Sequence, residues 1–255
     1  WMKLGTISLR SGNMEDAIAF FDRIPDESPL RAEADLQAGQ AAWSKYLRSA
    51  GDADAALEAD ALANRAAELL DRGLAKAPPG GQAGNASLVA ASQLARAQIF
   101  ARNGEFEAAI GLWAEEPSGL FAQAAAGTGA AARPEFAMEI YKTALRAYVG
   151  SQQYDQAEAT IDQLVALAEK SGSGGDAVTR VLVRLGQELE NQVAELQAAN
   201  KIAERNRVLT ALSTFLDKIA GRQEGNTYPT LLWVAETYTG IGSGLVSQGA
   251  RRLEA

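Results

Sequence analysis

Cysteine and histidine are both absent from the 255-residue sequence. Without cysteine the chain has no disulfide bond, no thiolate zinc site and no cysteine nucleophile. The lack of histidine removes the commonest general base and the commonest metal ligand of proteins. We therefore expect a protein without a catalytic site, metal site or cofactor.

Basic charge and long apolar runs are also scarce. The chain has 24 Lys and Arg against 32 Asp and Glu, a net charge of −8. Nucleic acids and anionic lipids bind basic surfaces, so neither is an expected partner. No run approaches the roughly 20 apolar residues of a membrane-spanning helix, so no membrane insertion is expected. The sequence begins and ends inside helix-like patterns, which suggests a piece of a longer protein.

Two apolar stripes with helical spacing lie at the start of the chain. They flank the polar break Ser11-Gly12-Asn13, and they comprise Trp1, Leu4, Gly5 and Ser8, then Ala17, Phe20, Phe21 and Ile24. Residues three or four apart share one helical face. Gly12 suits a helix C-terminus, Asn13 suits an N-cap, and Pro29 suits a stop. Residues 1–29 are thus predicted to form a helix hairpin, with Trp1, Leu4 and Phe21 packed beside Gly5 and Ala17.

An alanine followed four residues later by a large apolar residue recurs along the chain. The pairs are Ala17/Phe21, Ala66/Leu70, Ala109/Trp113, Ala157/Ile161 and Ala211/Phe215. The segments before Ala109 and Ala157 are also alike. Such recurrence predicts a repeated hairpin, and the alternative is a plain helical bundle with alanine-rich helices.

The first hairpin resembles a tetratricopeptide repeat. The residues at that family's offsets are Trp1, Leu4, Gly5, Ala17, Phe21 and Pro29, whereas Ser8 and Ile24 replace its tyrosine and second alanine. The resemblance implies an all-α fold, an α-solenoid with right-handed superhelical stacking of about five hairpins. Under this resemblance, residues 1–255 are expected to form a single repeat domain. The approximate hairpins are 1–29, 30–79, 86–117, 134–170 and 176–221, with a partial one at 229–255.

Several segments allow more specific expectations. A short helix is predicted around 120–126, and 177–220 is either a hairpin or one long helix because it contains no breaker after Gly186. Gly240 to Gly244 is read as a turn rather than a phosphate loop, since a helix precedes it. The acidic groups at Asp52/Asp54 and Glu115/Glu116 are read as solvated charge. Trp43, Trp113 and Trp233 are predicted core residues.

The resemblance implies a concave groove lined by the first helix of each hairpin. Its expected positions are Lys3, Thr6 and Arg10, then Leu94, Gln98 and Arg102, then Lys142, Thr143 and Arg146, and finally Trp233, Glu236 and Thr239. Arg102, Lys142 and Arg146 would form a basic strip for a carboxylate-bearing partner. The family's Lys/Asn carboxylate clamp is absent from this sequence. Ordinary solvated charges are the alternative reading of each position.

The predicted function is a non-catalytic scaffold that binds a protein or peptide. One alternative is a structural spacer within a larger protein. Another is an enzyme on a helical toroid, whose sites usually combine carboxylate pairs with aromatic platforms at loop tips. The expected loops here are rich in Gly, Ala and Ser, and aromatic residues make up only 7% of the sequence, which disfavours the enzyme.

Overall fold

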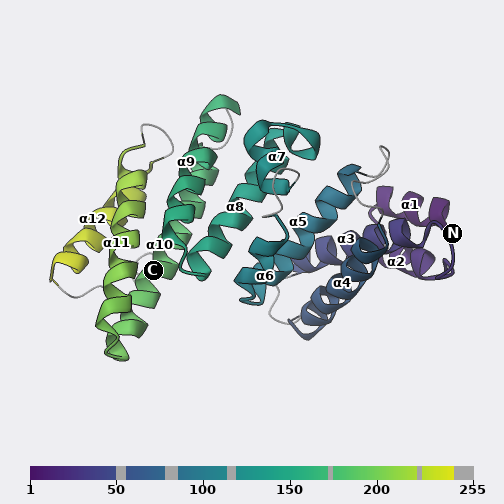
Figure 1. The fold of residues 1–255 in the computed structure, drawn as a ribbon, viewed down its shortest axis with the longest axis horizontal. Coiled ribbons are helices and arrows are strands. Elements are labelled where there is room, and N and C mark those ends of the chain that lie inside the picture. Colours follow the sequence, from purple (N-terminus) through teal and green to yellow (C-terminus); the bar gives the residue numbers. More distant parts are fainter. Residues whose placement is uncertain (50–55, 78–85, 114–118, 172–174, 223–225, 244–255) are drawn as a thin grey trace. The chain divides into compact units, whose positions relative to one another are not determined.

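The computed structural model describes residues 1–49, 56–77, 86–113, 119–171, 175–222 and 226–243. These residues form twelve α-helices and one 3-10 helix, and none of them forms a β-strand (Figure 1). The all-α prediction is confirmed. The predicted groups at Asp52/Asp54 and Glu115/Glu116, and residues 244–255 of the predicted partial hairpin, lie outside the described residues. Contacts divide the chain into two units, Trp1–Thr143 and Ala144–Ala255.

The first unit is built from consecutive helices. They are α1 (Met2–Arg10), α2 (Met14–Asp22), α3 (Arg31–Ser49), α4 (Ala56–Lys76), α5 (Ala86–Arg102), α6 (Phe106–Gly111), α7 (Leu120–Ala126) and the 3-10 helix η2 (Gly129–Ala132). Those from α1 to α6 pack on their sequence neighbours, α7 packs on η2, and η2 also packs on α5. Besides these contacts, α3 also packs on α5. The predicted short helix at 120–126 is confirmed. Helix α8 (Pro134–Gly150) contains the boundary between the units.

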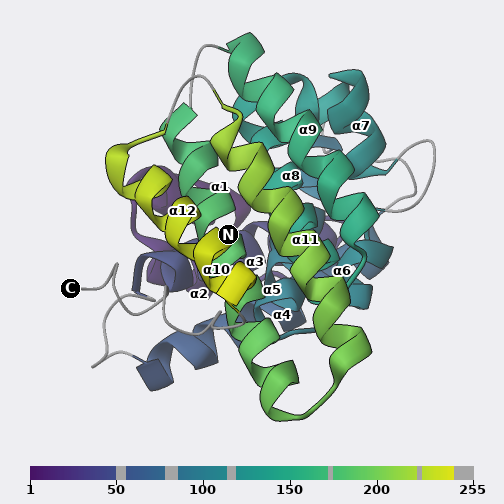
Figure 2. The same ribbon diagram turned by 90° about the vertical axis from the view of Figure 1, so that its left-hand side faces the viewer.

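The second unit continues with α9 (Tyr154–Ser171), α10 (Gly175–Ala198), α11 (Ile202–Ala220) and α12 (Tyr228–Ser243). Helix α11 packs on α9, α10 and α12, and Figure 2 shows α12 beside α11. A turn at Asn200 separates α10 from α11, so the single long helix considered for 177–220 is wrong.

One backbone turn closes four of the hairpins. Its left-handed residue is Gly12 (φ 78°), Gly104 (φ 78°), Gln152 (φ 61°) or Asn200 (φ 56°). In each case the next N–H donates to the carbonyl five residues earlier. These bonds are Asn13 to Ser8 (2.8 Å), Glu105 to Phe100 (2.9 Å), Gln153 to Tyr148 (2.8 Å) and Lys201 to Leu196 (2.9 Å). This pattern is the Schellman motif, which satisfies the last carbonyls of a helix.

The left-handed turn residue allows equivalent positions of the hairpins to be compared. Positions 104, 152 and 200 are separated by 48 residues each. Ala17, Ala109 and Ala157 each lie five residues after the left-handed residue, whereas Arg205 has that place in the last hairpin. The predicted fifth pair, Ala211/Phe215, is therefore six residues out of register.

All five predicted alanine/apolar pairs nevertheless lie in the core. Their ten side chains are at most 6% exposed. Two glycines let α3 and α4 approach closely. A Cβ on Gly39 would lie 2.7 Å from Leu70, and a Cβ on Gly73 would lie 2.6 Å from Leu36, so a larger side chain would not fit at either position. Trp43, Trp113 and Trp233 are buried, as predicted. Small residues and large ones thus alternate at the helix contacts, which gives close packing.

The apolar face of α1 is displaced from the predicted one. Trp1 is 54% exposed and Leu4 is 44% exposed, so the expectation that they fill the hairpin core is wrong. Met2 and Leu9 pack on the core instead, and Gly5 faces the ring of Phe21. Positions 2, 5 and 9 also have helical spacing, and α1 turns this face to α2 and α3. Trp1 stacks on Phe20, with ring centroids 6.0 Å apart.

Three predicted helix ends also differ. Helix α2 ends at Asp22, seven residues before Pro29, and α6 ends at Gly111. Helix α12 continues through Gly240 and Gly242 to Ser243, so the turn expected there is wrong for the described part. A glycine costs a helix about 1 kcal/mol relative to alanine, which weakens a helix without ending it.

Candidate functional site: a pocket beside the first helix

A pocket of about 370 Å³ lies between α1 and the start of α3. Four of its residues are basic, acidic or hydroxylated, and three are apolar. They are Met2, Lys3, Thr6, Ile7, Arg10, Leu30 and Glu33. Its volume falls within the range of ordinary ligand sites. The pocket brings together three predicted groove residues, Lys3, Thr6 and Arg10.

Helical geometry explains the α1 wall. Lys3, Ile7 and Arg10 are spaced by four and three residues, so they share one face. Thr6 lies on the same side; its hydroxyl donates to the Met2 carbonyl (3.0 Å) and lies 3.4 Å from Oε1 of Gln37 on α3. The contact with Gln37 links the wall formed by α1 to that formed by α3.

A buried arginine fixes the other wall. Arg31, at the start of α3, is 3% exposed and donates to the carbonyl oxygens of Phe21 (3.3 Å) and Ile24 (2.6 Å). These bonds satisfy carbonyls at the end of α2. They tie the α2–α3 connection, which carries Leu30, to the first turn of α3.

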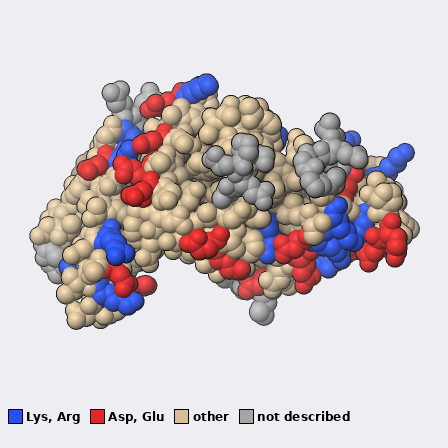
Figure 3. Space-filling model, in the orientation of Figure 1, with Lys and Arg blue, Asp and Glu red and all other residues tan. Residues whose placement is uncertain are grey.

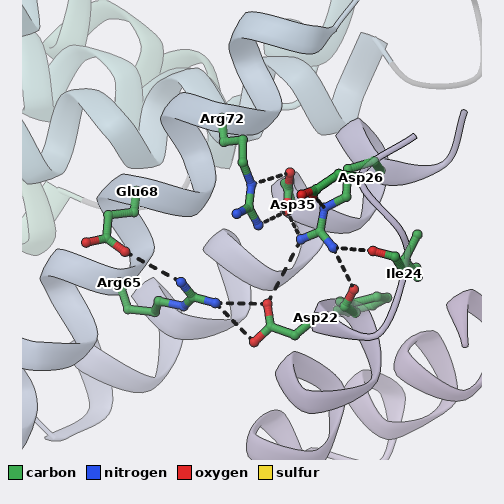
Figure 4. A network of polar contacts seen from close by, with 9 residues as sticks. Asp22, Ile24, Asp26, Asp35, Arg65, Glu68 and Arg72 are labelled. Atoms are coloured by element: carbon green, nitrogen blue, oxygen red, sulfur yellow. Dashed lines mark hydrogen bonds and ion pairs between the residues drawn. The ribbon is translucent and has the colours of Figure 1, made fainter. Parts of the chain in front are cut away.

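Arg31 pairs with Asp35, which belongs to a polar network that extends to Arg72 on α4 (Figure 4). Asp35 is fully buried and accepts from Arg31 and from Arg72, whose Nε lies 2.7 Å from Oδ2. Burial raises the pKa of Asp35, but the hydrogen bonds from Arg72 and Arg31 outweigh it and leave the pKa below its ordinary value. Asp35 is therefore an anion that pairs with two cations, and the network joins α2, α3 and α4.

The two pocket cations have a different environment. Lys3 and Arg10 are both exposed, and no ion pair or hydrogen bond joins their side chains to another of the described residues. The pocket acid is engaged, because Glu33 accepts from Nε2 of Gln37 (3.0 Å). Figure 3 shows basic and acidic groups side by side elsewhere over the N-terminal helices. Lys3 and Arg10 are thus available to an external anion.

Other predicted groove residues have partners within the chain. Gln98 accepts from Nε1 of Trp43 (2.8 Å). Arg102 donates to the Tyr46 hydroxyl (2.7 Å) and also pairs with Asp60, while Lys142 pairs with Glu139. The sequence missed these intramolecular partners because they come from elements remote in the chain or from an ordinary helical pair.

Leu94 and Thr143, both in the first unit, are only 6% and 7% exposed, so they belong to the core and not to a surface groove. The other predicted positions fall in the second unit. Arg146 is half-buried on α8, four residues after Lys142. Trp233 is 1% exposed, so its side chain belongs to the core and not to a surface groove. Glu236 is half-buried on α12, and Thr239 is exposed there.

Sequence reasoning missed the apolar part of the pocket. Ile7 is 59% exposed and Leu30 is 46% exposed, and neither was predicted to line a site. The Lys3/Ile7/Arg10 spacing was a detectable signal for Ile7. Leu30 gave no signal, because its place depends on how Arg31 orients the connection.

A buried carboxyl lies in the second unit. Glu190 on α10 is 2% exposed and accepts from the Thr237 hydroxyl on α12 (2.6 Å). Burial raises its pKa, and the hydrogen bond from Thr237 offsets this in part. Among the residues that the structure describes, no three His, Cys, Asp or Glu side chains come together as a metal site. Nor is any helix in those ranges long and apolar enough to cross a membrane.

Comparisons with protein families, curated proteins and solved structures found no match to this chain. The case for a function therefore depends on the pocket and on the repeated hairpins.

Proposed function

We propose that the chain is a non-catalytic scaffold that binds a protein or peptide, and that the pocket on α1 and α3 is part of its binding surface. The observation that carries this proposal is that apolar surface meets two cations in one concavity, and that neither cation has an ion-pair or hydrogen-bond partner among the described residues. Clefts that combine apolar walls with a few polar groups are the usual form of a binding site. The proposed partner is a protein or peptide because the pocket is open and continuous with exposed helix surface.

The fold proposed to carry this surface is an α-solenoid of tetratricopeptide-like hairpins, stacked with a right-handed superhelical sense. Four hairpins with the same Schellman turn support it, as do three turns at a spacing of 48 residues. Contacts between α3 and α5 also support it, because both are first helices of their hairpins. First helices that adjoin in this way form an extended surface in repeat proteins.

Selection from an unbiased library of displayed peptides tests this function. The wild-type chain is expected to enrich peptides that a Thr6→Trp variant no longer binds, because the indole would fill the pocket. Thr210→Trp on α11 is the matched control. Thr210 is exposed, and like Thr6 it donates its hydroxyl to the carbonyl four residues earlier. Failure to enrich any peptide with this dependence would favour a spacer.

A further inference from the structure

We propose that the pocket binds an extended acidic peptide in which an apolar side chain lies between two carboxylates. This inference depends on the proposed function and specifies the partner's chemistry. The apolar side chain would enter beside Met2, Ile7 and Leu30, while the carboxylates would pair with Lys3 and Arg10.

Charge complementarity is the first argument. The chain has a net charge of −8, and many of its basic side chains are paired with acids. In the first unit these pairs include Lys45 with Glu15, Arg65 with Asp22, and Arg96 with Asp71. Lys3 and Arg10 are instead free of described partners and flank the pocket. A basic peptide would gain nothing from them and would be attracted to the acidic surface elsewhere.

The apolar walls supply the second argument. Ile7 and Leu30 face the same pocket with about half of their surfaces in solvent. An apolar side chain seated between them would remove this surface from water, and the gain scales with the area covered. A peptide with charge alone would leave both residues exposed.

Spacing gives the third argument. Lys3 and Arg10 are seven residues apart, a rise of about 10 Å along α1. In an extended peptide every second side chain points to the same face, so a Glu-x-Leu-x-Glu segment presents three groups together over about 13 Å. The flexible Lys and Arg side chains span the difference. Glu33, at the α3 edge, would repel a carboxylate, which places the acidic groups along α1.

Fluorescence polarisation with a labelled Gly-Glu-Ser-Leu-Ser-Glu-Gly peptide, blocked at both ends, tests the inference on the full chain. We expect saturable binding that weakens as salt increases, because ions screen exposed charge pairs. The double variant Lys3→Glu/Arg10→Glu should bind about tenfold more weakly, through two lost pairs and new repulsion. A peptide with Gln for Glu, or with Ser for Leu, should also bind more weakly.

The matched control is Arg180→Glu/Arg184→Glu on the exposed side of α10. Both double variants change the net charge from −8 to −12, because each reversal removes two units of charge. The control should bind the probe as the wild type does, which separates a local effect from the total charge. Circular dichroism checks that both variants are folded.

Two results would overturn the inference. One is the absence of saturable binding to the wild type; the other is equal binding by the two charge-reversal variants. The display selection separates this failure from failure of the proposed function. Pocket-dependent peptides without acidic residues would keep the scaffold and reject the acidic partner. No pocket-dependent peptide of any composition would reject both.

Discussion

Gly186 on α10 lies against the outer edge of the Trp233 indole on α12. A Cβ built on Gly186 would be 2.5 Å from Cη2 of that ring. Because Trp233 is only 1% exposed and protein interiors are closely packed, the ring has little room to move. The glycine therefore sets how closely the two helices approach.

Gly186→Ala is expected to destabilise the chain. Overpacking costs typically ~1–3 kcal/mol, and the better helix propensity of alanine returns about 1 kcal/mol of this. Gly242→Ala is the matched control, since nothing lies within 4 Å of a Cβ at this helical position. Urea unfolding should show a lower midpoint for Gly186→Ala and an equal or higher one for Gly242→Ala. The same shift in both variants would mean that the close contact with Trp233 has no energetic consequence.

The sequence predicted that the helices exist, but it predicted less well which face of each helix is buried. The recurring alanine/apolar spacing predicted repeated helix hairpins, and all ten members of these pairs are buried, because burial follows the helical period. The same spacing assigned Trp1 and Leu4 to the core, although Met2, Gly5 and Leu9 fit a helical face equally well. Only the partner helix decides between two such faces, and its position is a tertiary property.

The pocket was half predictable for a similar reason. Lys3, Thr6 and Arg10 share a helix, so local geometry alone brings them together. Leu30 and Glu33 join them through the hydrogen bonds of Arg31 to the end of α2, which no pattern within one helix reveals. The turns show the same limit. Gln152 takes the conformation that Gly12 and Gly104 have, without a residue type that signals it, whereas Asn200 is the type that most often replaces glycine there.

The turn at Gln152 gives a second prediction. A left-handed conformation costs a non-glycine residue about 1–2 kcal/mol, so Gln152→Gly should raise the free energy of unfolding by about 1 kcal/mol. Gln156→Gly, in the exposed first part of α9, should lower it by a similar amount, since glycine weakens a helix interior. Chemical denaturation compares the two. Destabilisation by both substitutions would contradict the left-handed assignment.

Asp35→Asn should be among the most destabilising conservative substitutions. It removes the anion between Arg31 and Arg72 and leaves the Arg31 charge buried, a loss of roughly 3–5 kcal/mol. Asp71→Asn is the control, because Asp71 is 56% exposed and its pair with Arg96 is worth at most about 1 kcal/mol. Thermal unfolding at neutral pH measures both, and equal effects would contradict a structural role for the network.

The lowered pKa of Asp35 predicts that part of the folding stability is lost in acid. Its pKa is lower in the folded chain than its ordinary value of 3.8. The stabilisation that ionised Asp35 gives the folded chain is present above pH 3.8, and it is lost as the pH falls through the lower pKa of the folded state. The stability of Asp35→Asn should therefore change less than that of the wild type over this acidic range.

Ala109→Trp tests the packing of α6. Ala109 is fully buried, so the larger side chain should cost ~1–3 kcal/mol or more through overpacking. Ala108→Trp is the adjacent control, because Ala108 is exposed on the same short helix. Differential scanning calorimetry should show a lower Tm for the Ala109 variant alone. An unchanged Tm for Ala109→Trp would remove Ala109 from the helix contact.

Glu190 predicts a pH effect of the opposite sign to that of Asp35. Its folded pKa is raised above the ordinary 4.5, chiefly by burial, so the folded chain holds this proton more tightly than the unfolded chain. The stabilisation by protonated Glu190 is fully present below pH 4.5 and declines as the pH rises through the folded pKa.

Glu190→Gln keeps an acceptor for Thr237 without a charge. It should therefore be more stable than the wild type at neutral pH, with a smaller difference near pH 4.5. Glu195→Gln, an exposed position on the same helix, should show no such trend. Urea unfolding across this pH range measures the two variants, and a Glu190→Gln gain that is constant with pH would mean that Glu190 does not titrate as a buried acid.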